Sequence, residues 1–185
     1  VETPILQSKA GGAIAKPFRT HHNALNLDMY LRIAPELYLK RLVIGGFEKV
    51  FEIGKIFRNE GIDQTHQPEF TMLESYQAYA DMNIVMDMVE DMCNYVFDNL
   101  EIDKELEFND EKASFSGPWK RVSMYDLVSE KFGITINFNS KFEDLSSKLT
   151  DQNIDFEAKT VGLLVFELFE NFIEKEIKDP TFVID

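Results

Sequence analysis

A short segment of the chain gathers charged side chains between two apolar runs. Arg58 closes the first run, and Glu60, Asp63, His66 and Glu69 follow before the second run is under way. Hairpin loops usually have roughly 2 to 5 residues, and this one is longer. Loops held by rigid strands often carry binding residues, so we interpret the segment as a ligand-binding loop. A solvated hairpin tip is the alternative interpretation.

Two predicted strands must position this loop. Residues 50–57 are rich in Val, Ile and Phe, and residues 70–79 alternate apolar and polar side chains, which is typical of strands. Because side chains two apart share a face of a strand, Phe70, Glu74 and Tyr76 lie on one side together with Met72. A carboxylate on such a face is costly unless a cation meets it. The sequence therefore predicts an antiparallel hairpin in which Glu74 needs a positively charged partner.

The rest of the chain mixes helical and strand patterns. Pro35 and Gly45-Gly46 bracket one helix with typical start and stop signals. The periodicity predicts helices over 36–44, 82–100, 124–132, 142–149 and 161–177, short strands over 30–34, 134–138 and 181–184, and a loop or short β-excursion over 101–117. Mixed helices and strands around a long hairpin imply an α+β fold.

Composition is that of a globular chain. The 185 residues are 44% hydrophobic and 12% aromatic, enough for one core of ordinary size. No apolar run approaches the roughly 20 residues of a membrane span. The single cysteine, Cys93, has no partner for an internal disulfide and falls in a helical apolar pattern. We expect a cytoplasmic protein.

The net charge of −14 is unevenly distributed. Residues 1–79 carry 9 Lys and Arg against 9 Asp and Glu, whereas residues 80–185 carry 10 against 24. Lys and Arg contacts to phosphates normally dominate affinity for RNA. We therefore expect any RNA contact made by this chain to be weak and to come from its first part.

Several short motifs together carry a family resemblance. The hairpin resembles motif 2 of the class II aminoacyl-tRNA synthetases, in which Phe-Arg-x-Glu, a variable loop and an Arg or His lead to Phe-x-x-x-Glu. Gln67 departs from the Asn that the family usually has there. Further matching segments, which resemble the lysyl-tRNA synthetase family in particular, are Gly11-Gly12-Ala13, Thr20-His21-His22-Asn23, Arg32-Ile33-Ala34-Pro35-Glu36, Ala78-Tyr79-Ala80-Asp81, Pro118-Trp119-Lys120-Arg121 and Pro180-Thr181-Phe182-Val183-Ile184-Asp185.

The resemblance implies roles for individual residues in ATP-dependent activation of L-lysine. Arg58 would bridge the substrate carboxylate and the α-phosphate of ATP, which makes it the catalytic candidate. Glu60 would contact the adenine amino group, His66 the β- and γ-phosphates, and Phe70 would stack on adenine. The residues implied for lysine binding are, besides Arg58, the α-amino contacts Gly12 and Glu36 and the ε-ammonium contacts Glu74 and Tyr76.

The resemblance also implies what surrounds this chain. It suggests an internal piece of one catalytic domain, 1–185, that runs from the end of motif 1 through motif 2 of an antiparallel sheet flanked by helices. Motif 3, the anticodon-binding domain and the acids that bind Mg²⁺ beside ATP would lie elsewhere, the acids beyond Asp185. We expect the whole protein to dimerise and to charge tRNA(Lys), and this chain alone to be nearly inactive. No metal site is expected within it, although His21, His22 and His66 could be considered as ligands.

Other interpretations stay open at this point. Arg58 could form a salt bridge with Glu52 or Glu60, and Glu74 could form a structural pair with Arg32 or Arg58. The whole protein could transfer lysine to a protein acceptor, or it could be a non-catalytic relative that binds lysine or a nucleotide.

Overall fold

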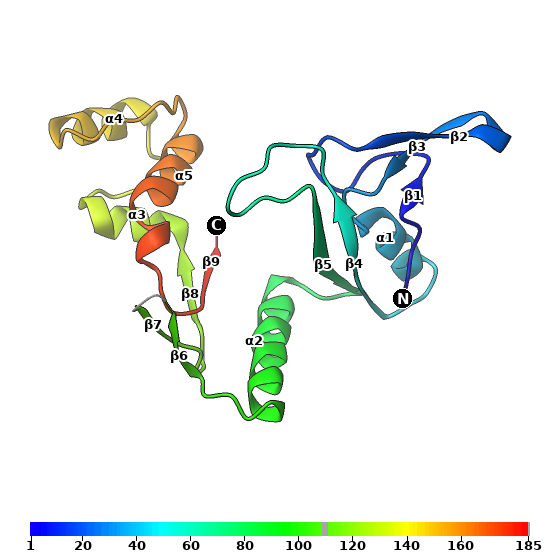
Figure 1. Ribbon diagram of the computed structural model, residues 1–185. Coiled ribbons are helices and arrows are strands. Elements are labelled where there is room, and N and C mark those ends of the chain that lie inside the picture. The colour runs from blue at the N-terminus through cyan, green and yellow to red at the C-terminus, as the bar shows by residue number, and fades with distance from the viewer. Residues whose placement is uncertain (109–110, 185) are drawn as a thin grey trace. The chain divides into compact units, whose positions relative to one another are not determined.

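The computed structural model describes residues 1–108 and 111–184. They fall into two compact units, Val1–Asp81 and Met82–Asp185. Each unit has its own helices and strands, which confirms the α+β class (Figure 1). The prediction that 1–185 forms one catalytic domain stays a prediction.

The first unit is built around a long hairpin and one helix. Its elements in chain order are β1(Leu6–Gln7), β2(Arg19–His22), η1(Asn23–Leu25), β3(Leu27–Leu31), α1(Glu36–Ile44), β4(Lys49–Phe57) and β5(Glu69–Gln77). β4 and β5 pair antiparallel from Lys49–Gln77 to Phe57–Glu69, which confirms the predicted hairpin. α1 packs against both strands, and Leu39 on α1 and Ile56 on β4 are almost fully buried.

A buried segment, residues 32–34, connects the small sheet β1-β3-β2 to the hairpin, and we call it the 32–34 strap. The backbone N–H of Arg32 donates to the carbonyl of Ile5 at 2.9 Å, and that of Phe57 donates to the carbonyl of Arg32 at 3.0 Å. The predicted strand over 30–34 is therefore wrong in its bounds, because β3 ends at Leu31. Arg32, Ile33 and Ala34 are buried between other elements instead of continuing the ladder.

The second unit contains most of the helices. Its elements are α2(Met82–Asn99), β6(Glu105–Phe108), β7(Glu111–Ser114), β8(Lys120–Ser123), α3(Met124–Phe132), α4(Phe142–Asp151), α5(Val161–Phe172), η2(Glu174–Glu176) and β9(Thr181–Ile184). β6 and β7 form the β-excursion predicted within 101–117, of which 109–110 lie outside the described residues. β8 pairs with β9 in parallel, whereas the other described strand pairs are antiparallel.

Helices α3, α4 and α5 surround the core of the second unit. Ser123 caps the start of α3 through its hydroxyl, which accepts the N–H of Asp126, and Gly133 caps its end in the left-handed conformation. The helix predicted over 161–177 is shorter in the structure: α5 ends at Phe172, and a 3₁₀ turn follows. All three helices contribute buried apolar side chains to this core: Val128, Leu145, Leu149, Leu164, Leu168 and Phe169.

The predicted strand over 134–138 is wrong. The structure has no strand there among the described residues. Ile134 and Ile136 are buried in the helical core, whereas Phe138 is fully exposed. The N–H of Ile136 is taken by the hydroxyl of Ser129 at 3.3 Å. The alternation of side chains thus reflects a loop that lies across helices. Over the described residues, no helix combines the length and the apolar character that crossing a membrane requires.

Candidate functional site

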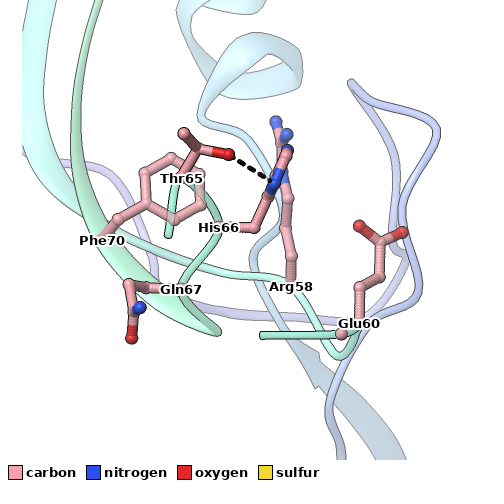
Figure 2. Close-up of a pocket in the computed structure, with 7 residues that line it drawn as sticks. Arg58, Glu60, Thr65, His66, Gln67 and Phe70 are labelled. Carbon is pink, nitrogen blue, oxygen red and sulfur yellow. Dashed lines mark hydrogen bonds between the residues drawn. The ribbon is translucent and has the colours of Figure 1, made fainter. Parts of the chain in front are cut away.

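The loop between β4 and β5 encloses a pocket of about 290 Å³. All four predicted nucleotide contacts line it, as Figure 2 shows. The lining residues are Arg58, Glu60, Gly61, Thr65, His66, Gln67 and Phe70. Arg58 directly follows β4, and Phe70 lies in β5 opposite Ile56, so the ladder of β4 and β5 fixes the base of the pocket.

Arg58 is half-buried at the base of this pocket. Its backbone N–H donates to the carbonyl of Pro68 at 2.9 Å, and its Nε donates to the carbonyl of Ile33 at 3.4 Å. The guanidinium carbon lies 5.3 Å from the centroid of the Phe70 ring, within cation–π distance. Across residues 1–108 and 111–184, no carboxylate forms an ion pair with Arg58: Glu52 pairs with Arg32, and Glu60 accepts from Lys16, so the alternative salt bridges of Arg58 are absent. Its two terminal nitrogens can therefore meet an anionic ligand.

The exposed rim of the pocket is held by hydrogen bonds from two directions. Glu60 accepts the backbone N–H of Lys16 at 3.3 Å, and the N–H of Asn59 donates to the carbonyl of Lys16 at 2.7 Å. On the opposite side, Nδ1 of His66 lies 2.9 Å from both carboxylate oxygens of Asp63. The rim thus presents an acid and an imidazole on either side of Arg58.

A second cluster contains the predicted lysine contacts. Gly12 lies against Glu36, since a Cβ at Gly12 would be 2.9 Å from the Cβ of Glu36. The hydroxyl of Tyr76 donates to Glu74 at 2.6 Å. Lys40 connects the two pairs: its Nζ donates to Glu36 at 2.6 Å and lies 5.7 Å from the centroid of the Tyr76 ring. Lys40 was missed by the sequence analysis, although its position four residues after Glu36 on a helix was a usable signal.

Two acids face each other across the hairpin on its inner side. Glu52 and Glu74 are directly opposite in the β4–β5 register, an arrangement that is unfavourable unless other groups compensate the charge. Arg32 compensates Glu52 at 2.5 Å, and both side chains are almost fully buried. Glu74 has only the Tyr76 hydroxyl as a hydrogen-bond donor within the described part of the chain. The alternative interpretation, a structural pair of Glu74 with Arg32 or Arg58, is therefore not found: Arg32 pairs with Glu52, and the Nε of Arg58 donates to the carbonyl of Ile33.

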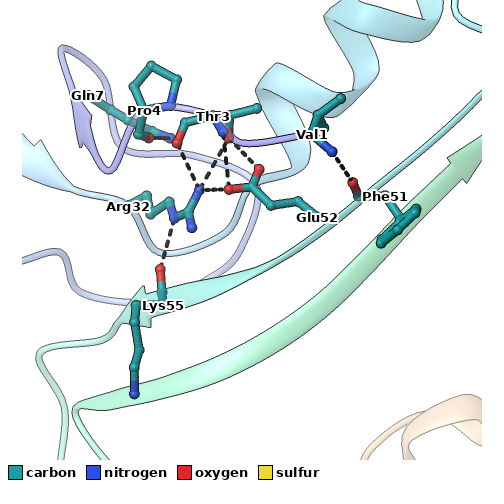
Figure 3. Close-up of polar contacts among 8 residues, drawn as sticks. All are labelled: Val1, Thr3, Pro4, Gln7, Arg32, Phe51, Glu52 and Lys55. Atoms are coloured by element: carbon teal, nitrogen blue, oxygen red, sulfur yellow. Dashed lines mark hydrogen bonds and ion pairs between the residues drawn. The ribbon is translucent and has the colours of Figure 1, made fainter.

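The hydrogen bonds around Glu52 form a closed network, drawn in Figure 3. Thr3 donates to Glu52 through its backbone N–H at 3.2 Å and its hydroxyl at 2.6 Å, and Arg32 also donates to the carbonyls of Thr3 and Lys55. Burial raises the pKa of Glu52, but the hydrogen bonds from Thr3 and Arg32 outweigh it and hold the pKa below its ordinary value. Glu52 is consequently ionised at neutral pH and paired with Arg32.

Tyr76 is a permanent donor to Glu74. Burial, the hydrogen bond to Glu74 and the negative charges of Glu74 and Glu36 all raise the pKa of the Tyr76 phenol above its ordinary value. Loss of the phenolic proton would add a third negative charge to this cluster. The cluster therefore attracts a cation and keeps its hydroxyl protonated.

The three histidines have separate partners and do not form a common metal site. His21 pairs with Asp28 at 2.7 Å, and the Nδ1 of His22 accepts the N–H of Leu25 at 3.3 Å. Among the described residues, no group of three or more His, Cys, Asp or Glu side chains is arranged to hold a metal ion.

Comparison with known proteins identifies the class. The family described as "tRNA synthetases class II (D, K and N)" matches residues 1–185. The chain belongs to this family, and the fold class predicted for it, a class II aminoacyl-tRNA synthetase domain, is confirmed.

Several curated relatives of this chain point to one member of that class. The chain is 48% identical over 189 residues to a lysine-tRNA ligase of Clostridium botulinum and 49% identical over 191 residues to that of Clostridium tetani, with all of this chain and 38% of each relative covered. It is 46% identical over 184 residues to the lysine-tRNA ligase of Enterococcus faecalis, covering 99% of this chain and 37% of the relative. The chain thus spans little more than a third of the length of these relatives.

Proposed function

We propose that the whole protein is a lysine-tRNA ligase that activates L-lysine with ATP and transfers it to tRNA(Lys). The observation that carries this proposal is the state of Glu74, a half-buried carboxylate that accepts from the Tyr76 hydroxyl and pairs with no cation among the described residues. The ε-ammonium of lysine would supply a positive charge at Glu74, and its α-amino group would meet Glu36, which also pairs with Lys40. The names of the similar relatives support the same substrate, and they favour tRNA over a protein acceptor.

Activation needs alignment and charge neutralisation more than acid–base chemistry. A carboxylate oxygen of lysine attacks the α-phosphorus of ATP, and the bond to the pyrophosphate oxygen breaks, so lysyl-adenylate and pyrophosphate result. Arg58 is proposed to bridge the attacking carboxylate and the α-phosphate, because a guanidinium offers paired donors to two anions. Its position 5.3 Å from the Phe70 ring supports a site in which adenine stacks nearby.

The remaining proposed contacts follow from the two clusters. Glu60 would accept from the adenine amino group, and His66 would meet the β- and γ-phosphates. Gly12 and Glu36 would take the α-amino group of lysine, and Glu74 with Tyr76 its ε-ammonium. Mg²⁺ would arrive bound to the phosphates of ATP and neutralise their charge; no metal ligand in this chain is assigned.

Amino-acid selectivity tests the proposal. Lysine-dependent ATP–pyrophosphate exchange by the whole protein is compared with exchange in the presence of ornithine or arginine. Glu74→Gln removes the anion and is expected to raise the KM for lysine about 10- to 100-fold, as for loss of a hydrogen bond to a charged group. Glu69→Gln is the matched control, because Glu69 is exposed on the same strand and pairs with Lys55. Equal exchange with all three amino acids, or an unchanged KM in Glu74→Gln, would contradict the assignment.

A further inference from the structure

The loop that closes the pocket contains an acid with an unusual number of donors. Oδ1 of Asp63 accepts the backbone N–H of Thr65 at 2.8 Å, its hydroxyl at 3.0 Å and the backbone N–H of His66 at 2.7 Å. The backbone N–H of Asp63 donates in turn to the carbonyl of His66 at 3.2 Å. Asp63 does not line the pocket itself, whereas Thr65 and His66 do (Figure 2).

The same carboxylate fixes the ring of His66. Nδ1 of the imidazole is 2.9 Å from both Oδ1 and Oδ2. The backbone N–H of Thr65, the side chain of His66 and the hydroxyl of Thr65 lower the pKa of Asp63 to about 2, so the group is a carboxylate at neutral pH. An ionised carboxylate can only accept, so Nδ1 must carry the proton in this contact. Nε2 is then the ring nitrogen available to a ligand.

Stability of the fold does not explain this arrangement. The side chains of His66 and Asp63 are 72% and 60% exposed, and exposed pairs of this kind add little to folding free energy. A bare negative charge would moreover repel phosphate from the pocket. The position of the Asp63 carboxylate is explained if it orients the His66 imidazole, as carboxylates that do not themselves touch the ligand orient histidines in other binding sites.

We propose that Asp63 is a positioning residue for nucleotide binding: it holds Nδ1 of His66 so that Nε2 faces the phosphate chain of ATP. The proposal rests on the proposed function, because it takes the anion at His66 to be the β- and γ-phosphates. Asp63 touches neither substrate; it acts through His66.

A double-mutant cycle on the whole protein tests this coupling. Asp63→Ala, His66→Ala and the double variant are compared with wild type in lysine-dependent ATP–pyrophosphate exchange. We expect Asp63→Ala to raise the KM for ATP about tenfold with the KM for lysine unchanged, and to have no further effect once His66 is Ala. A lowered KM for ATP would show simple repulsion, and additive effects would show an independent role in the loop; either result overturns the proposal.

A second measurement does not depend on enzymatic activity. In ¹⁵N-histidine NMR spectra above the titration of the ring, wild type should show His66 protonated at Nδ1, and Asp63→Ala should shift it toward the Nε2–H form. An unchanged tautomer in Asp63→Ala overturns the inference even if exchange is normal. Absence of lysine-dependent exchange in wild type, with the tautomer shift observed, would instead reject the proposed function and with it the ATP-binding part of this inference.

Discussion

Replacement of Arg32 by Met should destabilise the first unit strongly, although Arg32 is in neither ligand cluster. Arg32 and Glu52 are 2% and 3% exposed, and their N···O distance is 2.5 Å. Removing one partner of a buried ion pair costs about 3–5 kcal/mol. Thr3 would still donate two hydrogen bonds to Glu52, so we expect the lower end, about 3 kcal/mol, or roughly a 100-fold rise in the opening constant of the hairpin.

Amide hydrogen exchange of peptides that cover 49–57 is the appropriate assay. Fluorescence would report the wrong unit, because the single tryptophan, Trp119, lies in Met82–Asp185. Lys40→Met is the matched control in the same unit: the ion pair of Lys40 with Glu36 is 2.6 Å long, but the Lys40 side chain is 53% exposed. Lys40→Met should lower the free energy of unfolding by less than about 1 kcal/mol. If Arg32→Met accelerates amide hydrogen exchange no more than Lys40→Met does, the hydrogen-bond network of Arg32, Glu52 and Thr3 does not stabilise the hairpin.

Three further predictions concern the acidic cluster and its surroundings. Tyr76→Phe removes the hydroxyl that donates to Glu74 at 2.6 Å and should raise the KM for lysine about tenfold; an unchanged KM would show that the hydroxyl does not orient Glu74. Gly12→Ala should weaken lysine binding at least as much, because the φ of Gly12 is +91° and the new Cβ would lie 2.9 Å from Glu36; titration calorimetry with lysine measures it, and wild-type affinity would contradict it. The lowered pKa of Glu52 predicts stability that is fully present above the unfolded pKa of about 4.3 and declines as the pH falls through the lower folded value; protection factors of β4 amides between pH 7 and pH 3, which remove the intrinsic pH dependence of hydrogen exchange, test this, and a unit that becomes more stable on acidification would contradict it.

Local signals were sufficient for the elements that carry the site. The β4–β5 hairpin follows from two apolar runs around a polar loop, and α1 follows from Pro35, an apolar pattern and Gly45. Arg58, Glu60, His66 and Phe70 could be grouped in advance because they flank or occupy a single loop, and the structure gathers them at one pocket.

Tertiary contacts decided what the sequence could not. Both Glu52 and Glu74 are on the inner face of the hairpin, and only the course of the 32–34 strap determines that Arg32 reaches Glu52. Ile134 and Ile136 alternate as in a strand, but without a partner strand among the described residues they pack into a helical core. Asp63 was visible as a loop acid, yet its bond to His66 depends on the turn that the loop adopts.

Lysine-dependent ATP–pyrophosphate exchange by wild type and Arg58→Ala tests the central claim most directly. Arg58 has no competing carboxylate in the described residues, so its loss should remove transition-state stabilisation without unfolding the hairpin. We expect exchange by wild type and a fall in kcat of about 100-fold or more in Arg58→Ala, with hydrogen exchange of β4 unchanged and Lys55→Ala active as the control. ATP–pyrophosphate exchange at the wild-type rate by a folded Arg58→Ala variant would contradict the proposed role of Arg58. The absence of this exchange in wild type would contradict the proposed function.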